Sequence, residues 1–236
     1  MISIIIPTLD EERSLPALLD AIGQQRAVHE IIVVDGGSRD RTPELARDTG
    51  ARTLVSDCGR GAGLSIGAEA ARGDVLFFLH ADSTLAPGAL NRINEVLAAD
   101  PNIIGGNFRL VFDGDTGFSR RLTQFCAWIR LLGFYYGDSG IFVRRGVYQA
   151  LGGIRPMPLM EDWEFVRRLE RFGRTCCIAD PPLVTSSRRF AGRNLLEILY
   201  GLFRIHALYW LGVSPDRLLE IYRTQAPPQH TRKLRI

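Results

Sequence analysis

Lysine is nearly absent from this sequence, and the net charge is small. The 236 residues carry 29 basic and 26 acidic side chains, a net charge of +3, and Lys233 is the only lysine. So small a charge gives no reason to expect nucleic acid as a partner. A GC-rich genome would produce this arginine bias, but arginine also binds phosphate and carboxylate bidentately, so clusters of arginine are candidate anion sites.

Cysteine is also scarce, and its spacing excludes the usual cysteine-based sites. Cys58 and Cys126 stand alone, Cys176 and Cys177 are adjacent, and there is no CxxC pair. Neither a zinc site nor a disulfide framework is expected, and the adjacent pair predicts two buried thiols. The start MISIIIPTLDEE lacks the basic region and cleavage site of a signal peptide, so we expect a cytoplasmic location.

A long uninterrupted hydrophobic run is missing too. Residues 195–213 are strongly apolar and almost reach the roughly 20 residues that a bilayer-spanning helix needs. Glu197, Arg204 and His206 interrupt the run, and a charge at mid-bilayer costs about 2.5–3.5 kcal/mol. We therefore expect a buried or interfacial helix, which leaves peripheral membrane contact through 195–213 open.

Strands and helices alternate through the first hundred residues. The apolar patterns predict strands at 3–6, 30–34, 53–56 and 74–79, and helices at 15–22, 42–50, 61–72 and 87–98. Continuous apolar strands between helices are typical of an α/β protein whose parallel sheet is covered on both faces.

The second half is less regular. Residues 107–112 alternate like an antiparallel strand, while 118–132 and 161–172 are predicted helices. Because no repeat or linker separates the halves, we expect one domain spanning 1–236.

Polar clusters follow three of the predicted strands. They are Pro7-Thr8-Leu9-Asp10-Glu11, Asp35-Gly36-Gly37-Ser38 and His80-Ala81-Asp82. Ligands of open α/β sheets bind beyond the carboxyl ends of the strands, so these clusters predict a binding site.

Four motifs carry a resemblance to a known family. They are IIIPTLDEE (4–12), IIVVDGGSRD (31–40), FFLHADS (77–83) and MEDWEF (160–165). In this order they resemble the family 2 inverting glycosyltransferases, which use nucleotide sugars on a GT-A fold. The small size, the HAD cluster and SSRRF (186–190) resemble a subgroup associated with selenium and arsenic sugar metabolism, which includes the selenosugar synthase of selenoneine biosynthesis.

The resemblance implies a fold, a reaction and a division of the chain. The fold would be a mixed, mainly parallel GT-A sheet flanked by helices, with C-terminal helices. Residues 1–100 would form the nucleotide-binding half, 101–190 the acceptor half and 191–236 a C-terminal helical segment. The enzyme would transfer a hexose from UDP-N-acetylglucosamine or UDP-glucose by inverting displacement to a small anionic acceptor, selenophosphate, and form a selenosugar.

The resemblance also assigns the nucleotide sugar to particular residues. They are Pro7, Thr8, Glu11, Asp35, Gly37, Arg60, Ala81 and Asp82. Gly36 stands where the family usually has a second acid, which weakens an assignment of uracil specificity. The alternative is that Pro7 and the Asp35–Gly37 turn merely end strands.

A divalent cation is implied at the HAD cluster. Asp82 matches the last acid of the family's Asp-x-Asp motif and His80 replaces the first. The resemblance therefore implies Mg²⁺ or Mn²⁺ held by Asp82, with His80 as a second ligand or as a hydrogen-bonding group. The alternative for Asp82 is a helix or turn cap.

The acceptor site is expected around Glu161 and Asp162. Acids at a helix N-terminus are ordinarily stabilising, by about 0.3–1 kcal/mol, but the resemblance makes Asp162 a general base or an acceptor-orienting group, with Glu161 beside it. Gly137–Gly140 matches the family's acceptor-side segment. Acceptor or phosphate contacts are assigned to Asp138, Ser139, Arg188 and Arg189, with Arg193 nearby; a solvated basic patch is the alternative.

Two residue groups stay ambiguous and two other functions compete. His206 is predicted to be a satisfied core residue, and Tyr135-Tyr136 could stack on a sugar or belong to the core. Instead of selenophosphate, the acceptor could be a polyprenyl phosphate or another membrane or hydroxyl acceptor. A non-catalytic module that binds nucleotide sugar is the third hypothesis.

Overall fold

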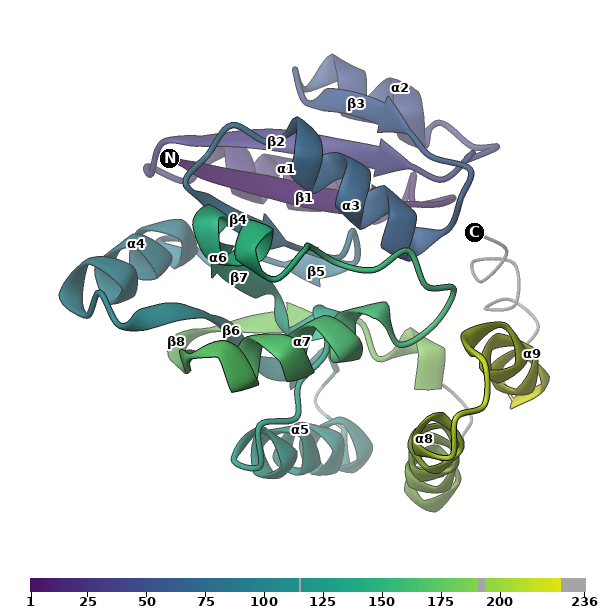
Figure 1. The fold of residues 1–236 in the computed structure, drawn as a ribbon. Helices are drawn as coiled ribbons and strands as arrows, with labels where there is room; N and C mark the ends of the chain where they lie inside the picture. The colour runs from purple at the N-terminus through teal and green to yellow at the C-terminus, as the bar shows by residue number, and fades with distance from the viewer. Residues whose placement is uncertain (115, 191–193, 226–236) are drawn as a thin grey trace.

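One eight-stranded sheet organises the protein. The computed structural model describes residues 1–114, 116–190 and 194–225, and its strands are ordered β3-β2-β1-β4-β7-β6-β8-β5 (Figure 1). The sheet runs from Ile2 to Thr185 and so crosses the boundary predicted near residue 100. The single domain over 1–236 stays a prediction.

The first half has the predicted alternation of strands and helices. Strands β1 (Ile2–Thr8), β2 (His29–Asp35), β3 (Arg52–Val55) and β4 (Val75–Phe78) are parallel. Helices α1 (Leu15–Gly23), α2 (Thr42–Asp48) and α3 (Arg60–Ala70) connect them, and α4 (Ala89–Ala99) follows. The expectation of an α/β fold is confirmed.

Strand β1 extends beyond the point where the sequence predicted its end at Pro7. The pairing of β1 with β4 ends at Ile5, whereas its pairing with β2 continues to Thr8. The missing N–H of Pro7 therefore faces no partner strand on the β4 side, and the proline is tolerated.

The second half adds strands of both directions. Its elements are β5 (Ser83–Thr84), β6 (Ile103–Phe112), α5 (Gly117–Arg130), η1 (Gly137–Ser139), β7 (Ile141–Arg144), α6 (Arg145–Ala150), α7 (Glu161–Phe172) and β8 (Arg174–Thr185). Strand β6 pairs antiparallel with β7 through Gly105–Asn107 and parallel with β8 along most of its length. The antiparallel pairing predicted for 107–112 is therefore wrong beyond Asn107, because these residues pair with β8.

Strand β8 is an element that the sequence pattern did not reveal. Pro181 and Pro182 interrupt its apolar run, and the register against β6 shifts at this point, from Phe108↔Ile178 to Leu110↔Leu183. The irregularity accommodates the two prolines within the strand. The prediction of two buried thiols in β8 is wrong: Cys176 is half-buried and Cys177 is exposed, because this stretch lies beyond the short pairing with β5 at the sheet margin.

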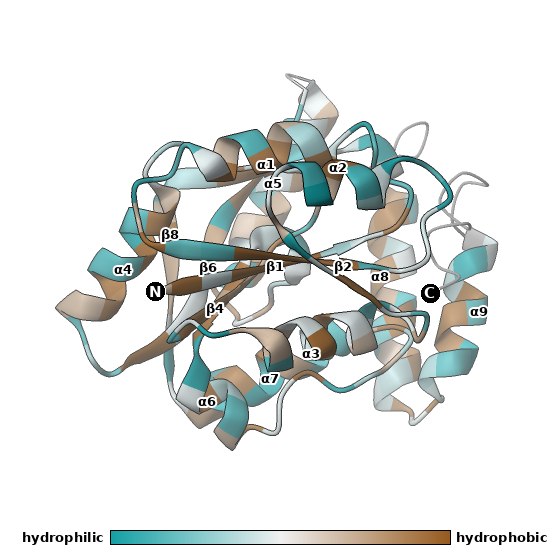
Figure 2. Ribbon diagram, turned by 90° about the horizontal axis from the view of Figure 1, so that it is seen from above, coloured by the Kyte–Doolittle hydropathy of each residue, from teal (hydrophilic) through white to brown (hydrophobic). Residues whose placement is uncertain are grey.

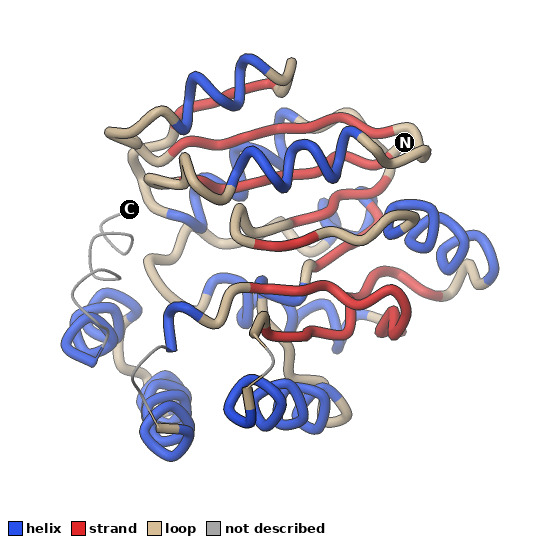
Figure 3. The backbone as a smooth tube through the Cα atoms, turned by 180° about the vertical axis from the view of Figure 1, so that it is seen from behind, coloured by secondary structure: helices blue, strands red, loops and turns tan. Residues whose placement is uncertain are grey.

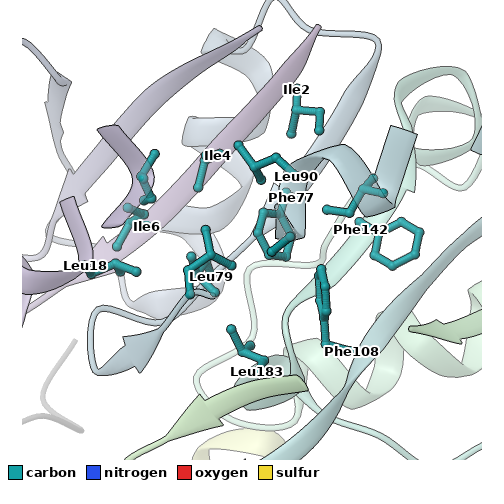
Figure 4. Packing of buried hydrophobic residues seen from close by; sticks show 14 of the residues in the cluster. Ile2, Ile4, Ile6, Leu18, Phe77, Leu79, Leu90, Phe108, Phe142 and Leu183 are labelled. Atoms are coloured by element: carbon teal, nitrogen blue, oxygen red, sulfur yellow. The ribbon is translucent and has the colours of Figure 1, made fainter. Parts of the chain in front are cut away.

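The core lies on both faces of the sheet. Ile2, Ile4 and Ile6 of β1 face α1 and α4, whereas the alternate residue Ile5 faces α3, α6 and α7. Figure 2 shows α1 and α2 on one side of the strands and α3, α6 and α7 on the other. Figure 4 shows Phe77 packed among the isoleucines, Leu79 and Phe108.

The C-terminal helices lie outside this sandwich. After the short η2 helix (Arg188–Phe190), α8 (Leu195–Trp210) packs beside α5 through a shared cluster that includes Leu122 and Ile198, and α9 (Pro215–Gln225) follows. Figure 3 shows these helices from behind, on one side of the sheet. Within the described ranges, each helix is too short or too polar to cross a membrane.

Candidate active site

The turn after β2 is built around the Asp35 carboxylate. It accepts hydrogen bonds from the backbone N–H groups of Gly37 and Ser38, both at 3.0 Å, from the Ser38 hydroxyl, and from Thr8 of β1 at 3.3 Å. Gly37 has φ +86°, a conformation that glycine adopts without strain. Asp35 therefore fixes the turn and joins it to the end of β1.

The loops after β1 and β2 are joined by further hydrogen bonds. The N–H of Asp10 donates to Ser38 Oγ at 2.9 Å, and the N–H of Arg39 donates to Asp10 Oδ1 at 2.9 Å. The N–H of Glu11 donates to Thr42 Oγ1 at 2.8 Å. These bonds hold the two loops as one rigid wall beyond the carboxyl ends of the strands.

Arg188 connects this wall to the HAD cluster. Its Nη2 lies 3.1 Å from Glu11 Oε2, 3.1 Å from Ser14 Oγ and 3.5 Å from Asp82 Oδ2. The Asp82 side chain is 27% exposed, so solvent and ligands reach it. The two carboxylates and the guanidinium form a charged group at the site where the resemblance places a diphosphate.

A second charged group lies at the start of α7. Glu161 and Asp162 are buried, and Arg60, from the first turn of α3, hydrogen-bonds Glu161 through Nε and lies 3.7 Å from Asp162 Oδ2. The backbone N–H of Gly137 donates to the same Asp162 oxygen at 2.9 Å. The sequence prediction that Arg60 contacts the nucleotide stays a prediction, whereas its pairing with the two acids was not foreseen.

The surroundings of the two acids move their pKa values apart. Burial tends to raise the pKa of Asp162, but the charge of Arg60 and the amide of Gly137 outweigh it, and the pKa lies below the usual value. For Glu161 burial prevails over the charge of Arg60 and raises the pKa. Asp162 is therefore the acid that is ionised over the wider pH range.

His80 faces Asp162 across Gly137. A Cβ atom on Gly137 would lie 2.8 Å from His80 Nε2 and 3.2 Å from Asp162 Oδ2, so both atoms point at this glycine. Burial, and after it the positive charge of Arg60, lowers the pKa of His80. Its imidazole is therefore neutral near pH 7, and the glycine is required by the close approach.

The residues fit a divalent cation only in part. In the part of the chain that the structure describes, no three His, Cys, Asp or Glu side chains are grouped as metal ligands. Asp82 offers one accessible carboxylate, and oxygens of a bound diphosphate would have to supply most of the remaining ligands. Metal ligation by His80 stays a prediction, and its Nε2 atom lies near Gly137 and Asp162.

Both charged groups open into one cavity of about 570 Å³. Its polar side includes the loop after β1, Arg60, His80–Asp82, Asp162 and Arg188. Its other side is apolar and comes largely from α5 and α8. The apolar residues include Phe112, Leu122, Phe125, Ile129, Leu159, Met160, Phe190, Leu202 and Ile205.

Tyr136 and His206 are site residues for which the sequence indicated no definite catalytic or binding role. Both line the cavity, and the Tyr136 hydroxyl lies 3.1 Å from His206 Nε2, while His206 Nδ1 lies 2.8 Å from the carbonyl of Leu202. Nδ1 therefore carries the proton, and Nε2 accepts the hydrogen bond from Tyr136. The interruption of an apolar helix by His206 was the available signal.

The cavity brings together most of the predicted site residues. Those that line it are Pro7, Thr8, Glu11, Arg60, His80, Ala81, Asp82, Asp138, Asp162 and Arg188. Asp35 and Glu161 stand behind this lining, Gly37 belongs to the Asp35 turn, and Ser139 donates to the Tyr136 carbonyl at 2.7 Å. The Arg189 side chain and Arg193 lie outside the described residues.

Solved structures identify the fold. Staphylococcus aureus TarS 1–349, crystallised with UDP-GlcNAc, superposes with a TM-score of 0.65 over 95% of this chain and 71% of that one, at 16% identity. The mannosyltransferase PcManGT from Pyrobaculum calidifontis, crystallised with GDP-Man and Mn²⁺, gives 0.64 over 99% and 67%, at 20% identity. The chain has the GT-A glycosyltransferase fold, as the resemblance implied.

Sequence comparison gives the family. The family described as "Glycosyl transferase family 2" matches residues 3–155. A "PGL/p-HBAD biosynthesis glycosyltransferase" of Mycobacterium bovis is 31% identical over 206 residues, which are 78% of this chain and 72% of that protein. An undecaprenyl-phosphate 4-deoxy-4-formamido-L-arabinose transferase of Aeromonas hydrophila is 33% identical over 117 residues, 44% of this chain and 36% of that one. The chain belongs to glycosyl transferase family 2 and is a glycosyltransferase.

Proposed function

We propose that the enzyme transfers a hexose from UDP-N-acetylglucosamine or UDP-glucose, by inverting displacement, to an acceptor that has an apolar body. The observation that supports this is the single cavity, whose lining includes Arg188 and Asp162 together with apolar residues of α5 and α8. Two fold neighbours that were crystallised with UDP-GlcNAc or with UDP and Mn²⁺ support UDP as the nucleotide.

The donor would occupy the wall formed by the loops after β1 and β2. Pro7 and Thr8 line it, and the rigid Asp35 turn supports it from behind. Arg188 lines the cavity beside Asp82, and its guanidinium has the geometry to bind diphosphate oxygens there. Asp82 would hold Mg²⁺ or Mn²⁺, and a bound divalent cation neutralises negative charge on a departing diphosphate.

The transfer itself needs one proton acceptor at most. The acceptor oxygen attacks the anomeric carbon, the bond from that carbon to the diphosphate breaks, and UDP leaves with the bonding electrons. Asp162 takes the acceptor's proton when there is one. Its lowered pKa makes it a weak base, which suits an acidic nucleophile such as a phenol or a phosphate monoester better than an aliphatic alcohol.

The apolar side of the cavity favours the class of acceptor. A polyprenyl phosphate or a phenol with an alkyl chain would bury apolar surface against α5 and α8, worth about 0.8 kcal/mol per methylene group. One relative is named for undecaprenyl phosphate, which agrees with this class. The third hypothesis, a non-catalytic module that binds nucleotide sugar, disagrees with membership of a glycosyltransferase family. Measured turnover would exclude it.

Selenophosphate, the acceptor implied by the subgroup resemblance, is the second candidate. Arg60 and Arg188 line the cavity and favour an anion. A small anion, however, would leave the apolar side of the cavity uncovered. With selenophosphate, Asp162 would orient the acceptor and would not need to remove a proton.

A UDP-release assay with product mass analysis tests the proposal. Each donor, with Mg²⁺ or Mn²⁺, is combined with decyl phosphate, ethyl phosphate, 4-nonylphenol, phenol or selenophosphate. We expect the long-chain member of each matched pair to have at least about tenfold higher kcat/KM. Phe125→Ser, at the apolar side, should reduce this preference and leave the short acceptors unchanged.

The outcomes separate the parts of the proposal. Faster turnover with selenophosphate than with either long-chain acceptor would refute the apolar acceptor and leave the donor assignment intact. Asp162→Asn should abolish transfer to the phenol and preserve transfer to selenophosphate. Absence of UDP release with every acceptor, together with absence of UDP binding, would refute the enzyme's proposed donor.

A further inference from the structure

Exposed apolar side chains are concentrated on α5 and α8. Of the twelve large hydrophobic side chains that are exposed in the described chain, eight lie on these helices or directly after them. We name them the α5/α8 outer surface: Trp128, Leu131, Leu132, Leu196, Tyr200, Phe203, Trp210 and Leu211. Each is between 57% and 83% exposed.

The exposed residues of α8 form a stripe along one face. Leu196, Tyr200, Phe203 and Trp210 are spaced by four, three and seven residues, which places them on one side of a helix. The opposite side carries the buried residues, such as Ile205. A surface helix normally has one apolar face against the core, so the second apolar face requires a separate explanation.

The two helices bring their exposed residues to the same part of the molecule. They share a hydrophobic cluster, and Figures 1 and 3 both show them beside each other at the end of the molecule farthest from β3. The outer surface therefore comes from two neighbouring helices, and exposed apolar patches on monomeric proteins mark interaction sites.

We propose that the α5/α8 outer surface docks on an anionic lipid bilayer. Tryptophan and tyrosine together with leucine and phenylalanine are the residues that insert at the headgroup boundary. Exposed Arg120 and Arg121 stand on α5, and exposed Arg204 stands on α8 next to the stripe. Their charge complements anionic headgroups. Since α8 has only 16 residues, it lies along the membrane surface and does not cross it.

The outer surface and the cavity belong to the same two helices, which links the docking to the reaction. Phe125 and Ile129 of α5 and Leu202 and Ile205 of α8 line the cavity, while other residues of the same helices form the outer surface. Docking through these helices would hold the cavity close to the bilayer that carries an acceptor with a long apolar chain. This link rests on the proposed function, whereas the docking itself does not.

Vesicle co-sedimentation of the full chain tests the docking. We expect the protein to sediment with vesicles of phosphatidylcholine and phosphatidylglycerol, and less so in high salt. The double substitution Leu131→Ser and Phe203→Ser should lower the partition coefficient at least about tenfold. Val55→Ser, an equally exposed apolar residue of β3 at the far edge of the sheet, is the matched control and should change nothing.

Two results would overturn the docking. The wild type could stay in the supernatant, or the double variant could sediment as well as the wild type. Light scattering tests whether a second copy of the chain covers the α5/α8 outer surface instead. A wild-type dimer that becomes a monomer in the double variant would also refute docking on a bilayer. UDP binding should be the same in wild type and both variants, which shows that they are folded.

The same proteins separate this inference from the proposed function. If the wild type sediments with vesicles and the double variant does not, docking is supported. This holds even if no acceptor leads to UDP release, a result that would refute only the proposed function. Transfer to decyl phosphate by a protein that never sediments refutes docking alone.

Discussion

Replacement of Arg60 by glutamine is the sharpest test of the charged group at the start of α7. The substitution removes the guanidinium and leaves a side chain that is still polar. Glu161, which is 1% exposed, then loses its hydrogen-bonded counter-ion, and Asp162 loses the charge at 3.7 Å. Both carboxylates would have to ionise in a buried position without a neighbouring cation.

The cost follows from the exposure of the pair. Removal of one partner from a buried ion pair costs about 3–5 kcal/mol. The Arg60 side chain is 38% exposed, so water already screens part of the interaction, and we reduce the expected loss to about 1.5–2.5 kcal/mol. In a protein of this size that corresponds to a decrease in Tm of about 3–10 °C.

The loss should depend on pH. The pKa of Asp162 in the folded wild type lies below its usual value, so its ionisation stabilises the fold above the unfolded pKa, near 4. That contribution is lost as the pH falls through the folded pKa. In the variant both acids instead favour the protonated form. The difference in unfolding free energy between the two proteins should therefore be largest at pH 7 and shrink toward about pH 4.

Urea unfolding followed by tryptophan fluorescence measures this difference. Arg92→Gln is the matched control, because Arg92 pairs with Glu95 on an exposed helix surface; it should cost no more than about 0.5 kcal/mol at any pH. A loss in Arg60→Gln as small as in this control, or a loss that does not change between pH 7 and pH 4, would refute the assignment of a buried ion pair.

Three further predictions concern the glycines and the metal. Gly137→Ala would place its Cβ 2.8 Å from His80 Nε2, so kcat should fall at least about tenfold, and steady-state kinetics would measure it; full activity would contradict the close approach. Gly106→Ala would bring a Cβ to 2.1 Å from a backbone carbonyl of β8 and should destabilise the fold by at least about 2 kcal/mol in urea. Gly146→Ala, in helix α6 with open space around the new Cβ, should instead leave the stability unchanged or raise it by up to about 1 kcal/mol. Asp82→Asn should weaken UDP binding in the presence of Mn²⁺ but not in EDTA, by calorimetry; an equal loss in both would argue against a metal ligand.

The sequence predicted those parts of the fold that have a local signal. The strands of the first half are continuous apolar runs, and α7 was expected at 161–172, which are its observed bounds. The polar clusters that end β1 and β4 converge on one cavity, because the carboxyl ends of parallel strands meet at one edge. Strand β8 could not be predicted, since two prolines hide its pattern and their placement depends on β6.

The site was less predictable than the fold. Arg60 and Glu161 are 101 residues apart, and no short-range pattern reports which distant charges become partners. The apolar side of the cavity was missed for the same reason, because it depends on how α5 and α8 pack beside each other. The residues of His80–Asp82 were foreseen, but their surroundings required the three-dimensional arrangement.

The contact between Arg188 and Glu11 has a consequence for co-translational folding. It joins residues 177 positions apart, and contacts of such long range form slowly because the intervening chain must first be ordered. On the ribosome the amino-terminal strands can pair early, but the guanidinium of Arg188 is added 177 residues after Glu11. The charged group of Arg188, Glu11 and Asp82 therefore forms only after β8 has been synthesised.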